Sequence, residues 1–439
     1  MKKQNIVYLH SHDTGRFIRP YGHAVNTPAM QRFAEQGVVF RQAFAAAPNC
    51  SPSRAALLTG EYPHNNGMNG LDHRGGFVLN DYSRHILHTL RDHGYLTVLG
   101  GLQHIGRDTD AIGFDRVLGN ARSPKAEEVI ARVTDFLADP PDQPFFLDCG
   151  VYETHKDQRR FSSAPEFPDT RFTETPASLP DTPETRLEMA RFAKALEVLD
   201  NAYDTVLTAL ETHGLAHNTL VIITTDHGLP LAGHKRTLTD GGTGVLLMMR
   251  GPGGFSGGKI IDAMVSQIDI FPTLCEYLDI PAPERLQGRS MMPLIQKEQD
   301  EIHDAIFTEL TYHTTYMPLR AVRTKRWKYI KSFADKKQRN FGGDPGRCID
   351  QWEKVGCPKR FLAEEQLYDL LFDPAQACNL AYDPEYNKVL NEMRARLLAW
   401  QKETDDPILK GDIPPVTENG LNGPIPSSKG RQGKNVMTD

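Results

Sequence analysis

Long apolar runs and closely spaced cysteines are both missing from this sequence. Its 439 residues include six cysteines, none of them in a CxxC pair, so we expect neither a disulfide scaffold nor a zinc ribbon. No apolar run approaches the roughly 20 residues of a membrane span. The apolar run behind the two N-terminal lysines covers only residues 6–9, whereas the core of a secretory signal takes about 7 to 15 residues. We therefore expect no membrane partner and a cytoplasmic protein, or a periplasmic one if a leader has been removed.

An excess of positive charge is missing as well. The formal net charge is -6 at pH 7, with 39% hydrophobic and 24% charged residues. This balance is typical of a globular protein and argues against nucleic acid as a partner of the whole chain.

The length predicts more than one unit, because single hydrophobic cores stop growing at about 250 to 300 residues. We expect a large first domain over residues 1–300 and a smaller one over residues 301–404. Residues 405–439 are rich in Pro, Gly, Asn and Ser, which favours an extended arm.

Strand-like and helix-like segments alternate through the first 300 residues. Apolar runs such as "NIVYLH" and "TLVIITT" read as buried strands, and amphipathic segments such as "KAEEVIARVTDFLAD" read as helices. This alternation predicts an α/β fold with a mostly parallel sheet between helices. After residue 300 the strands look shorter and antiparallel and a helix follows, which indicates a smaller α+β subdomain.

Polar residues follow four of the predicted strands at the point where each ends. In an open parallel sheet, ligands bind beyond the carboxyl ends of the strands. Any one of these residues alone is most simply a capping residue, but together they suit a metal site or acid–base chemistry. Carboxylates favour a hard cation over zinc, whereas the histidines leave zinc open. The residues are His10, His12, Asp13, Gln103, His104, Glu153, His155, Asp226 and His227.

Cys50 occupies an unusual place in "NCSPSRAALLTG", residues 49–60. A helix N-terminus and a nearby arginine, here Arg54, both stabilise a thiolate. Cys50 is therefore either a nucleophile or a buried structural residue, and composition does not choose between them.

The same segment resembles the signature of the type I sulfatases, C-x-P-S-R followed by T-G. The resemblance extends over most of the chain and includes "TTDHG", "SQIDIFPTL" and "LYDLLFDPAQACNLA". Within that family, "PHNNGMNGL", "QHIG" and "LLAWQKETDDP" are similar to the heparan N-sulfatase (sulfamidase) branch and its bacterial relatives. The resemblance implies an alkaline-phosphatase-like fold and a sulfuric ester hydrolase.

In that family the signature cysteine is oxidised to formylglycine by a maturation enzyme. The resemblance thus implies that position 50 carries an aldehyde, hydrated to a gem-diol. One hydroxyl attacks sulfur and the alcohol or amine departs; the second expels sulfate and restores the aldehyde. Arg54 would neutralise the diolate and sulfate oxygens, and Ser53 would help to hold the diol.

The resemblance also assigns a metal and the remaining catalytic groups. Asp13, Asp226 and position 50 would bind Ca²⁺ or another divalent cation, with His227 where the family carries Asn or His. His104 would take the diol proton and His155 would protonate the leaving group. Lys235 would contact a sulfate oxygen, with Arg236 as a rival.

Two positions depart from the family pattern. His12 precedes Asp13 where most members have two adjacent aspartates, and Leu102 stands where a lysine is usual. The losses of one carboxylate and one ammonium offset each other in charge, and they weaken the expectation of calcium. Gln103 or His12 would take over the lost sulfate contacts.

Three segments are candidates for saccharide binding. Residues 320–340 carry nine Lys or Arg and one Asp, which indicates either an electrostatic funnel for an anionic sugar or solvated strand faces. The loop predicted over residues 309–318, with Tyr312 and His313, and the segment with His73 and Arg74 would line a pocket, or else form capping turns.

The predicted function is the hydrolysis of a sulfate ester or sulfamate of a small sulfated saccharide. One alternative is a phosphodiester or phosphonate hydrolase of the same superfamily. Another is a non-catalytic protein that binds sulfated sugars. The sequence leaves a homodimer open.

Overall fold

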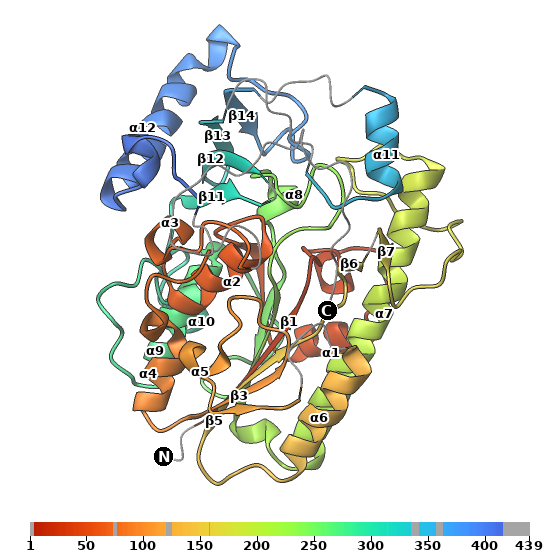
Figure 1. Ribbon diagram of the computed structural model, residues 1–439, viewed down its shortest axis with the longest axis vertical. Helices are drawn as coiled ribbons and strands as arrows, with labels where there is room; N and C mark the ends of the chain where they lie inside the picture. Colours follow the sequence, from red (N-terminus) through yellow and green to blue (C-terminus); the bar gives the residue numbers. More distant parts are fainter. Residues whose placement is uncertain are drawn as a thin grey trace.

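The computed structural model describes residues 4–72, 77–119, 125–157, 159–313, 315–334, 342–356 and 363–415. Figure 1 shows a large sheet with helices on both sides and, above it, a second smaller sheet. In the described part of the chain, no helix combines the length and the hydropathy needed to cross a membrane.

The large sheet has eight strands in the order β10-β2-β9-β8-β1-β5-β3-β4. All neighbours are parallel except β9, which runs antiparallel to β2 and β8. The predicted α/β class with a mostly parallel central sheet is confirmed. The strands are β1 (Asn5–Ser11), β2 (Val38–Phe44), β3 (Leu96–Gly101), β4 (Arg116–Val117), β5 (Phe145–Gly150), β8 (Thr219–Thr225), β9 (Leu247–Arg250) and β10 (Lys259–Ser266).

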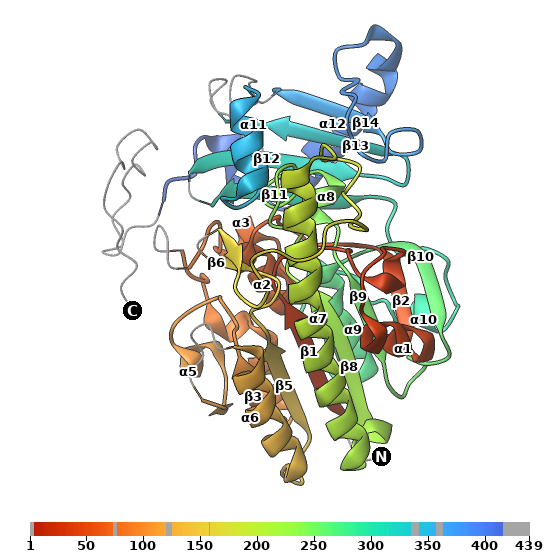
Figure 2. The ribbon, with the colours of Figure 1, turned by 90° about the vertical axis from the view of Figure 1, so that its right-hand side faces the viewer.

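Both faces of this sheet are buried. Successive side chains of β1 enter different cores: Ile6 and Tyr8 pack into one cluster, and Val7 and Leu9 pack into the other. This explains why the central strands are apolar throughout instead of alternating. Figures 1 and 2 show α6 and α7 covering one face and α4, α9 and α10 on the opposite side.

Helices lie between most of these strands along the chain. They are α1 (Pro28–Gln36), α2 (Cys50–Thr59), α3 (Pro63–Asn66), α4 (Ile86–Asp92), α5 (Thr109–Ile112), α6 (Ala126–Ala138), α7 (Pro183–Thr212), α8 (Asp240–Thr243), α9 (Ile270–Tyr277) and α10 (Met292–Ile295). A two-stranded hairpin, β6 (Lys156–Asp157) and β7 (Arg160–Phe161), precedes α7.

The second sheet is antiparallel, as predicted, with the order β11-β12-β13-β14. Met393, Leu397 and Trp400 of the last helix pack with Val322 and Tyr329 of the sheet in one core. The exact domain boundaries stay predictions. The elements are β11 (Ile306–Tyr312), β12 (Tyr316–Arg323), β13 (Trp327–Ser332), β14 (Glu365–Asp369), α11 (Arg347–Lys354) and α12 (Asn387–Glu403).

The strand order brings four carboxyl ends together. β1 pairs with β8 on one side and with β5 on the other, and β5 pairs with β3. The segments that leave these strands therefore meet at one edge of the sheet, and α2 begins close to them.

Candidate active site

Cys50 is the first residue of α2 and lies in the interior. Asn49 before it is extended, and its side-chain amide donates to the carbonyl of Tyr312 at 2.7 Å. Sγ of Cys50 lies 3.3 Å from Nε2 of His227. Burial raises the pKa of the thiol, but Lys235 and His227 override it and hold the pKa well below its usual value. Position 50 thus faces a cationic environment that favours an anion.

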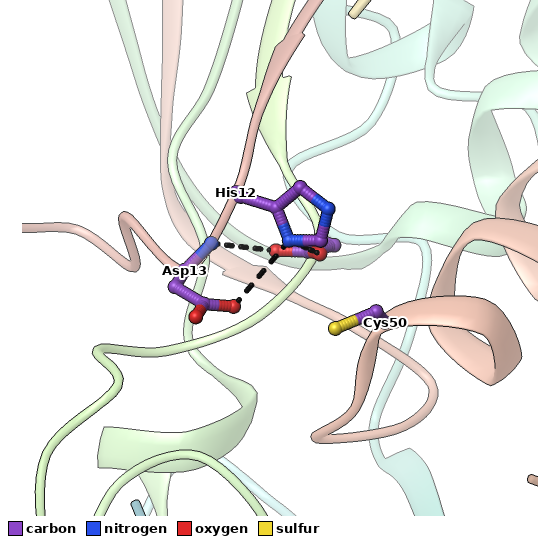
Figure 3. Close-up of side chains that lie close together, drawn as sticks. His12, Asp13 and Cys50 are labelled. Atoms are coloured by element: carbon purple, nitrogen blue, oxygen red, sulfur yellow. Dashed lines mark hydrogen bonds and ion pairs between the residues drawn. The ribbon is translucent and has the colours of Figure 1, made fainter. Parts of the chain in front are cut away.

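Two carboxylates meet in front of Cys50. Asp13 leaves β1 with a φ of 55°, and its backbone N–H donates to Oδ1 of Asp226 at 2.8 Å. Figure 3 shows the side chains of His12 and Asp13 on the side toward which the thiol points. Side-chain ligand atoms of His12, Asp13, Cys50 and Asp226 all lie within 4.8 Å of one another.

His227 completes this group. Its Nδ1–H donates to the carbonyl of Gly228 at 3.0 Å, so Nε2 faces Oδ1 of Asp13 at 3.1 Å. Burial lowers the pKa of His227, but Asp226 and Asp13 raise it overall to about 9. The carboxylates therefore attract positive charge to this point.

These donors fit a divalent cation. Nδ1 of His12 and Oδ1 of Asp13 are buried and make no hydrogen bond with the described residues. Nδ1 of His12 lies 3.0 Å from a carboxylate oxygen of Asp226. Carboxylates suit calcium, magnesium or manganese, and imidazoles suit transition metals. This mixed set of ligand atoms supports a divalent cation, and it suits metals other than calcium as well.

Arg54 is held rigidly beneath the carboxylates. One terminal nitrogen donates to Asp226 at 3.0 Å and to the carbonyl of Ser11 at 2.9 Å. The other donates to Nδ1 of His10, whose Nε2–H donates in turn to Asp148 at 2.7 Å. All of these side chains are buried, so Arg54 is a fixed cation.

Lys235 and His155 lie on the other side of Asp13. Nζ of Lys235 is 2.9 Å from Oδ2 of Asp13 and 2.8 Å from Asp344. Nε2 of His155 is 4.0 Å from the same oxygen of Asp13. Burial and the charge of Lys235 lower the pKa of His155 to about 4.

His104 approaches from the segment after β3. Its ring lies 5.6 Å from that of His12, and its Nε2 lies 3.4 Å from Asp72. The catalytic and metal-binding residues predicted from the sequence therefore converge on one place.

Ser53 and Gln103, which the sequence predicts as substrate contacts, bond to the framework. The hydroxyl of Ser53 donates to the carbonyl of Asp226 at 2.5 Å and ties α2 to the end of β8. The side chain of Gln103 accepts from the N–H of Ile105 at 2.6 Å and donates to the carbonyl of Gly106. Their substrate contacts stay predictions.

The loop predicted over residues 309–318 is wrong. Ile306–Tyr312 and Tyr316–Arg323 are paired strands. The ring of Tyr312 is buried and its hydroxyl donates to the carbonyl of Ile413 at 2.5 Å, while His313 lies in the short turn. His73 and Arg74 lie outside the described residues.

The described Lys and Arg residues of the basic stretch over residues 320–340 form ion pairs within the protein. Each of them has an acidic partner, which favours the structural interpretation over a funnel. The pairs are Arg320 with Asp406, Arg323 and Lys328 with Asp240, Lys325 with Glu301, Arg326 with Asp369, and Lys331 with Glu364.

Two residues of the site were not predicted from the sequence. Asp344 lies in "FGGDPGR" and follows no predicted strand, so nothing in the sequence places it beside Lys235. Asp148 interrupts the apolar strand "FFLDCG". A carboxylate inside a buried strand needs a partner. The position of Asp148 in the strand could therefore have predicted its pairing with a residue such as His10.

The chain matches two described families. Residues 4–280 match "Sulfatase", and residues 232–342 match "N-sulphoglucosamine sulphohydrolase, C-terminal".

Similar curated proteins align over most of their lengths. Human N-sulphoglucosamine sulphohydrolase is 28% identical over 92% of this chain and 91% of its own. An ulvan-active sulfatase of Formosa agariphila is 27% identical over 100% of this chain and 86% of its own. A Delta 4,5-hexuronate-2-O-sulfatase of Bacteroides thetaiotaomicron is 26% identical over 99% of this chain and 97% of its own.

Solved structures share the fold. A putative sulfatase of Bacteroides thetaiotaomicron superposes with a TM-score of 0.72 at 23% identity, covering 93% of this chain and 94% of its own. A structure described as a complex with its substrate D-glucosamine-2-N,6-O-disulfate superposes with a TM-score of 0.73 at 18% identity, covering 92% and 99%.

Proposed function

Because the chain belongs to the sulfatase family, we propose that it removes a sulfate group from a saccharide by using a formylglycine formed from Cys50. One observation carries the proposal. The side chain at position 50 projects from the start of a buried helix into a cluster of two carboxylates, two imidazoles and the cations Arg54 and Lys235.

The nucleophile is supplied by the modified residue. A hydrated formylglycine supplies one hydroxyl that attacks sulfur and a second that expels sulfate and restores the aldehyde. Cys50, at the buried N-terminus of α2, directs its thiol toward the side on which His12 and Asp13 lie (Figure 3).

A divalent cation would supply positive charge beside that hydroxyl and make it more acidic. The residues that would hold it are Asp13, Asp226, His12, His227 and position 50. Arg54 donates to Asp226, and Lys235 donates to Asp13. They keep the carboxylates fixed and present cationic groups to the sulfate oxygens.

Two histidines would move protons. His155 lies beside Lys235 and would protonate the departing sugar oxygen or nitrogen. The ring of His104 lies 5.6 Å from that of His12, and His104 would accept the proton of the second hydroxyl. Each histidine would thus serve its own half-reaction.

We propose a sulfated aminosugar or uronic acid of a glycosaminoglycan-type chain as the substrate. The printed names of the relatives support this class: one is an N-sulphoglucosamine sulphohydrolase and another a hexuronate-2-O-sulfatase.

The test begins with maturation. The chain is produced together with a formylglycine-generating enzyme, and the peptide that contains residue 50 is weighed by mass spectrometry. Conversion of the thiol to an aldehyde lowers its mass by about 18 Da, from the chemical change in the side chain. Sulfate release is then measured from N-sulfoglucosamine, a 6-O-sulfated glucosamine and a 2-O-sulfated uronic acid, with aryl phosphate esters as the comparison.

We expect release from one of the sulfated sugars and loss of turnover in Cys50→Ala. A chelator should abolish release, and the cation that restores it, Ca²⁺ or a transition metal, identifies the metal. Full activity with an intact thiol at position 50, or faster hydrolysis of phosphate than of sulfate esters, would contradict the proposal.

A further inference from the structure

We propose that a basic hollow next to the active site binds a second acidic group of the saccharide, a sulfate or a carboxylate on a sugar beyond the one that is cleaved. The proposal rests on the proposed function and adds a binding site to it. The hollow has a volume of about 460 Å³ and lies among the β6–β7 hairpin, α7 and α11. Figures 1 and 2 both show these elements together at the upper end of α7.

The lining carries a net positive charge. Five basic side chains outnumber the three acidic ones, Glu166, Glu184 and Asp350, of which Asp350 pairs with Arg159 and Glu166 with Arg160. The basic residues are Arg159, Arg160, Arg191, Arg347 and Lys354.

Arginines that repel one another are held together in this lining. Arg191 is only 6% exposed, and its guanidinium donates to the carbonyl of Glu166 instead of to a carboxylate. Burial and the charge of Arg347 lower the pKa of Arg191. Arg347 and Lys354 have no acidic partner among the residues that the structure describes. An anion between these side chains would relieve the repulsion.

A buried ion pair fixes one of the segments that line the hollow. Lys156 of β6 and Glu188 of α7 form a buried ion pair with an N–O distance of 2.5 Å. Glu188 also accepts the backbone N–H of Arg347 at 2.8 Å, which fixes the start of α11. A Cβ on Gly346 would come within 2.5 Å of the same carboxylate, so any larger residue would displace the carboxylate.

The two segments that build the hollow also reach the active site. Asp344, three residues before Arg347, contacts Lys235, and His155 lies four residues before Arg159. Because a residue spans at most about 3.6 Å, the Cα atoms of Asp344 and Arg347 lie within about 11 Å of each other. The hollow therefore lies close enough to Lys235 for one saccharide of a few sugar units to reach both.

The chemistry of the lining suits sulfate and carboxylate groups. Arginine binds both with two parallel charge-assisted hydrogen bonds. Since Arg347 and Lys354 are exposed, solvent screens them, and we expect a moderate gain in affinity from each.

The experiment compares a short with a long substrate. Arg347→Gln combined with Lys354→Gln removes two charges, and the backbone bond of residue 347 to Glu188 is kept. We expect the KM for a heparin-derived tetrasaccharide to rise about tenfold, in line with the loss of two solvent-screened charge contacts, while the KM for N-sulfoglucosamine stays unchanged. Lys388→Gln, an exposed lysine on α12, is the matched control and should change neither value.

Binding is measured separately from turnover. In a Cys50→Ala background, calorimetry with the tetrasaccharide and with its chemically desulfated, carboxyl-reduced form tests the hollow without any sulfate release. Binding of the acidic tetrasaccharide that weakens with the double substitution supports the proposal.

Unchanged binding of the tetrasaccharide, or equal losses for both substrates, would overturn the hollow as a binding site. If the wild type releases no sulfate from any sugar, the proposed function fails, whereas the calorimetry still decides the role of the hollow.

Discussion

At the scale of single residues, Arg54 depends on a pair that touches neither Cys50 nor the cation ligands. His10 accepts from Arg54 and donates to Asp148, so the buried carboxylate fixes which nitrogen of His10 carries the proton. Burial lowers the pKa of His10, which agrees with a neutral imidazole that accepts from the guanidinium. His10 and Asp148 are thus positioning residues for Arg54.

We predict that replacing His10 and Asp148 lowers kcat by more than the loss of folding stability accounts for. His10→Leu alone leaves the carboxylate of Asp148 buried without a partner, which destabilises the protein. The double variant His10→Leu/Asp148→Leu removes that charge, yet Arg54 still loses its support. We expect kcat in the double variant to fall about 10- to 100-fold, the usual cost of removing a group that orients an active-site residue.

The conservative variant His10→Gln provides the control, because its amide can accept from Arg54 and donate to Asp148. It should recover most of kcat. Wild-type kcat in the double variant, measured together with urea unfolding, would show that the pair serves stability alone.

His155 gives a prediction about pH. Burial and Lys235 lower its pKa to about 4, so in the free enzyme its protonated form is lost as pH rises through about 4. If His155 protonates the leaving group, kcat/KM falls with rising pH from that point. A bound sulfate offsets the charge of Lys235 and raises the pKa, so the fall in kcat should lie at higher pH than the fall in kcat/KM.

Full pH profiles of both constants check this. In His155→Gln the fall on the basic side should disappear while a low residual rate remains. An unchanged profile in that variant would assign the proton to another group.

At the scale of elements, α4 carries a buried titratable cap. Nδ1 of His85 accepts the backbone N–H of Leu87 at 3.2 Å at the start of the helix. Burial lowers the pKa of His85 to about 3, against about 6.5 for an unfolded chain. Between these values the unfolded state binds more protons, so stability falls as pH falls from about 6.5 toward 3.

We predict that His85→Asn reduces this loss, since asparagine also caps helices but does not titrate. The free energy of unfolding from urea curves should drop by about 2 kcal/mol less in the variant than in the wild type between pH 6.5 and pH 5, at about 1.4 kcal/mol per pH unit. Parallel losses in the two proteins would contradict the assigned pKa.

The strands also show which features of the site could be predicted from the sequence. Apolar strands and the rule that ligands bind at carboxyl ends were enough to predict that His12, Asp13, Asp226 and His227 lie together. Their place beside Cys50 followed only from the resemblance to the sulfatases. The hairpin of β11 and β12 was missed in part because its polar residues suggested a loop. Glu309 and Arg320 face each other in register and form an ion pair at 3.1 Å, and a partner on another strand cannot be seen from local sequence.

At the scale of the whole molecule, a buried charge network joins the large sheet unit to the small sheet. His64 of α3 donates through its backbone N–H to Glu309 at 2.8 Å and through its ring at 2.7 Å. Arg320 contacts Glu309 and also Asp406 at 2.7 Å. Three parts of the chain far apart in sequence thus share one desolvated network, which helps the two units to unfold together.

We predict that Arg320→Met strongly destabilises the protein, because it leaves the carboxylates of Glu309 and Asp406 buried without their shared cation. Breaking a buried pair in this way costs about 3 to 5 kcal/mol. The matched control is Arg32→Met: Arg32 and its partner Asp204 are both about half exposed, so the loss of this pair should cost at most about 1 kcal/mol. Urea unfolding followed by intrinsic fluorescence measures both variants.

Because the network connects the two sheet units, Arg320→Met should also divide a single unfolding transition into two. Equal midpoints for the two variants, or one unchanged transition in Arg320→Met, would show that apolar packing alone holds the units together.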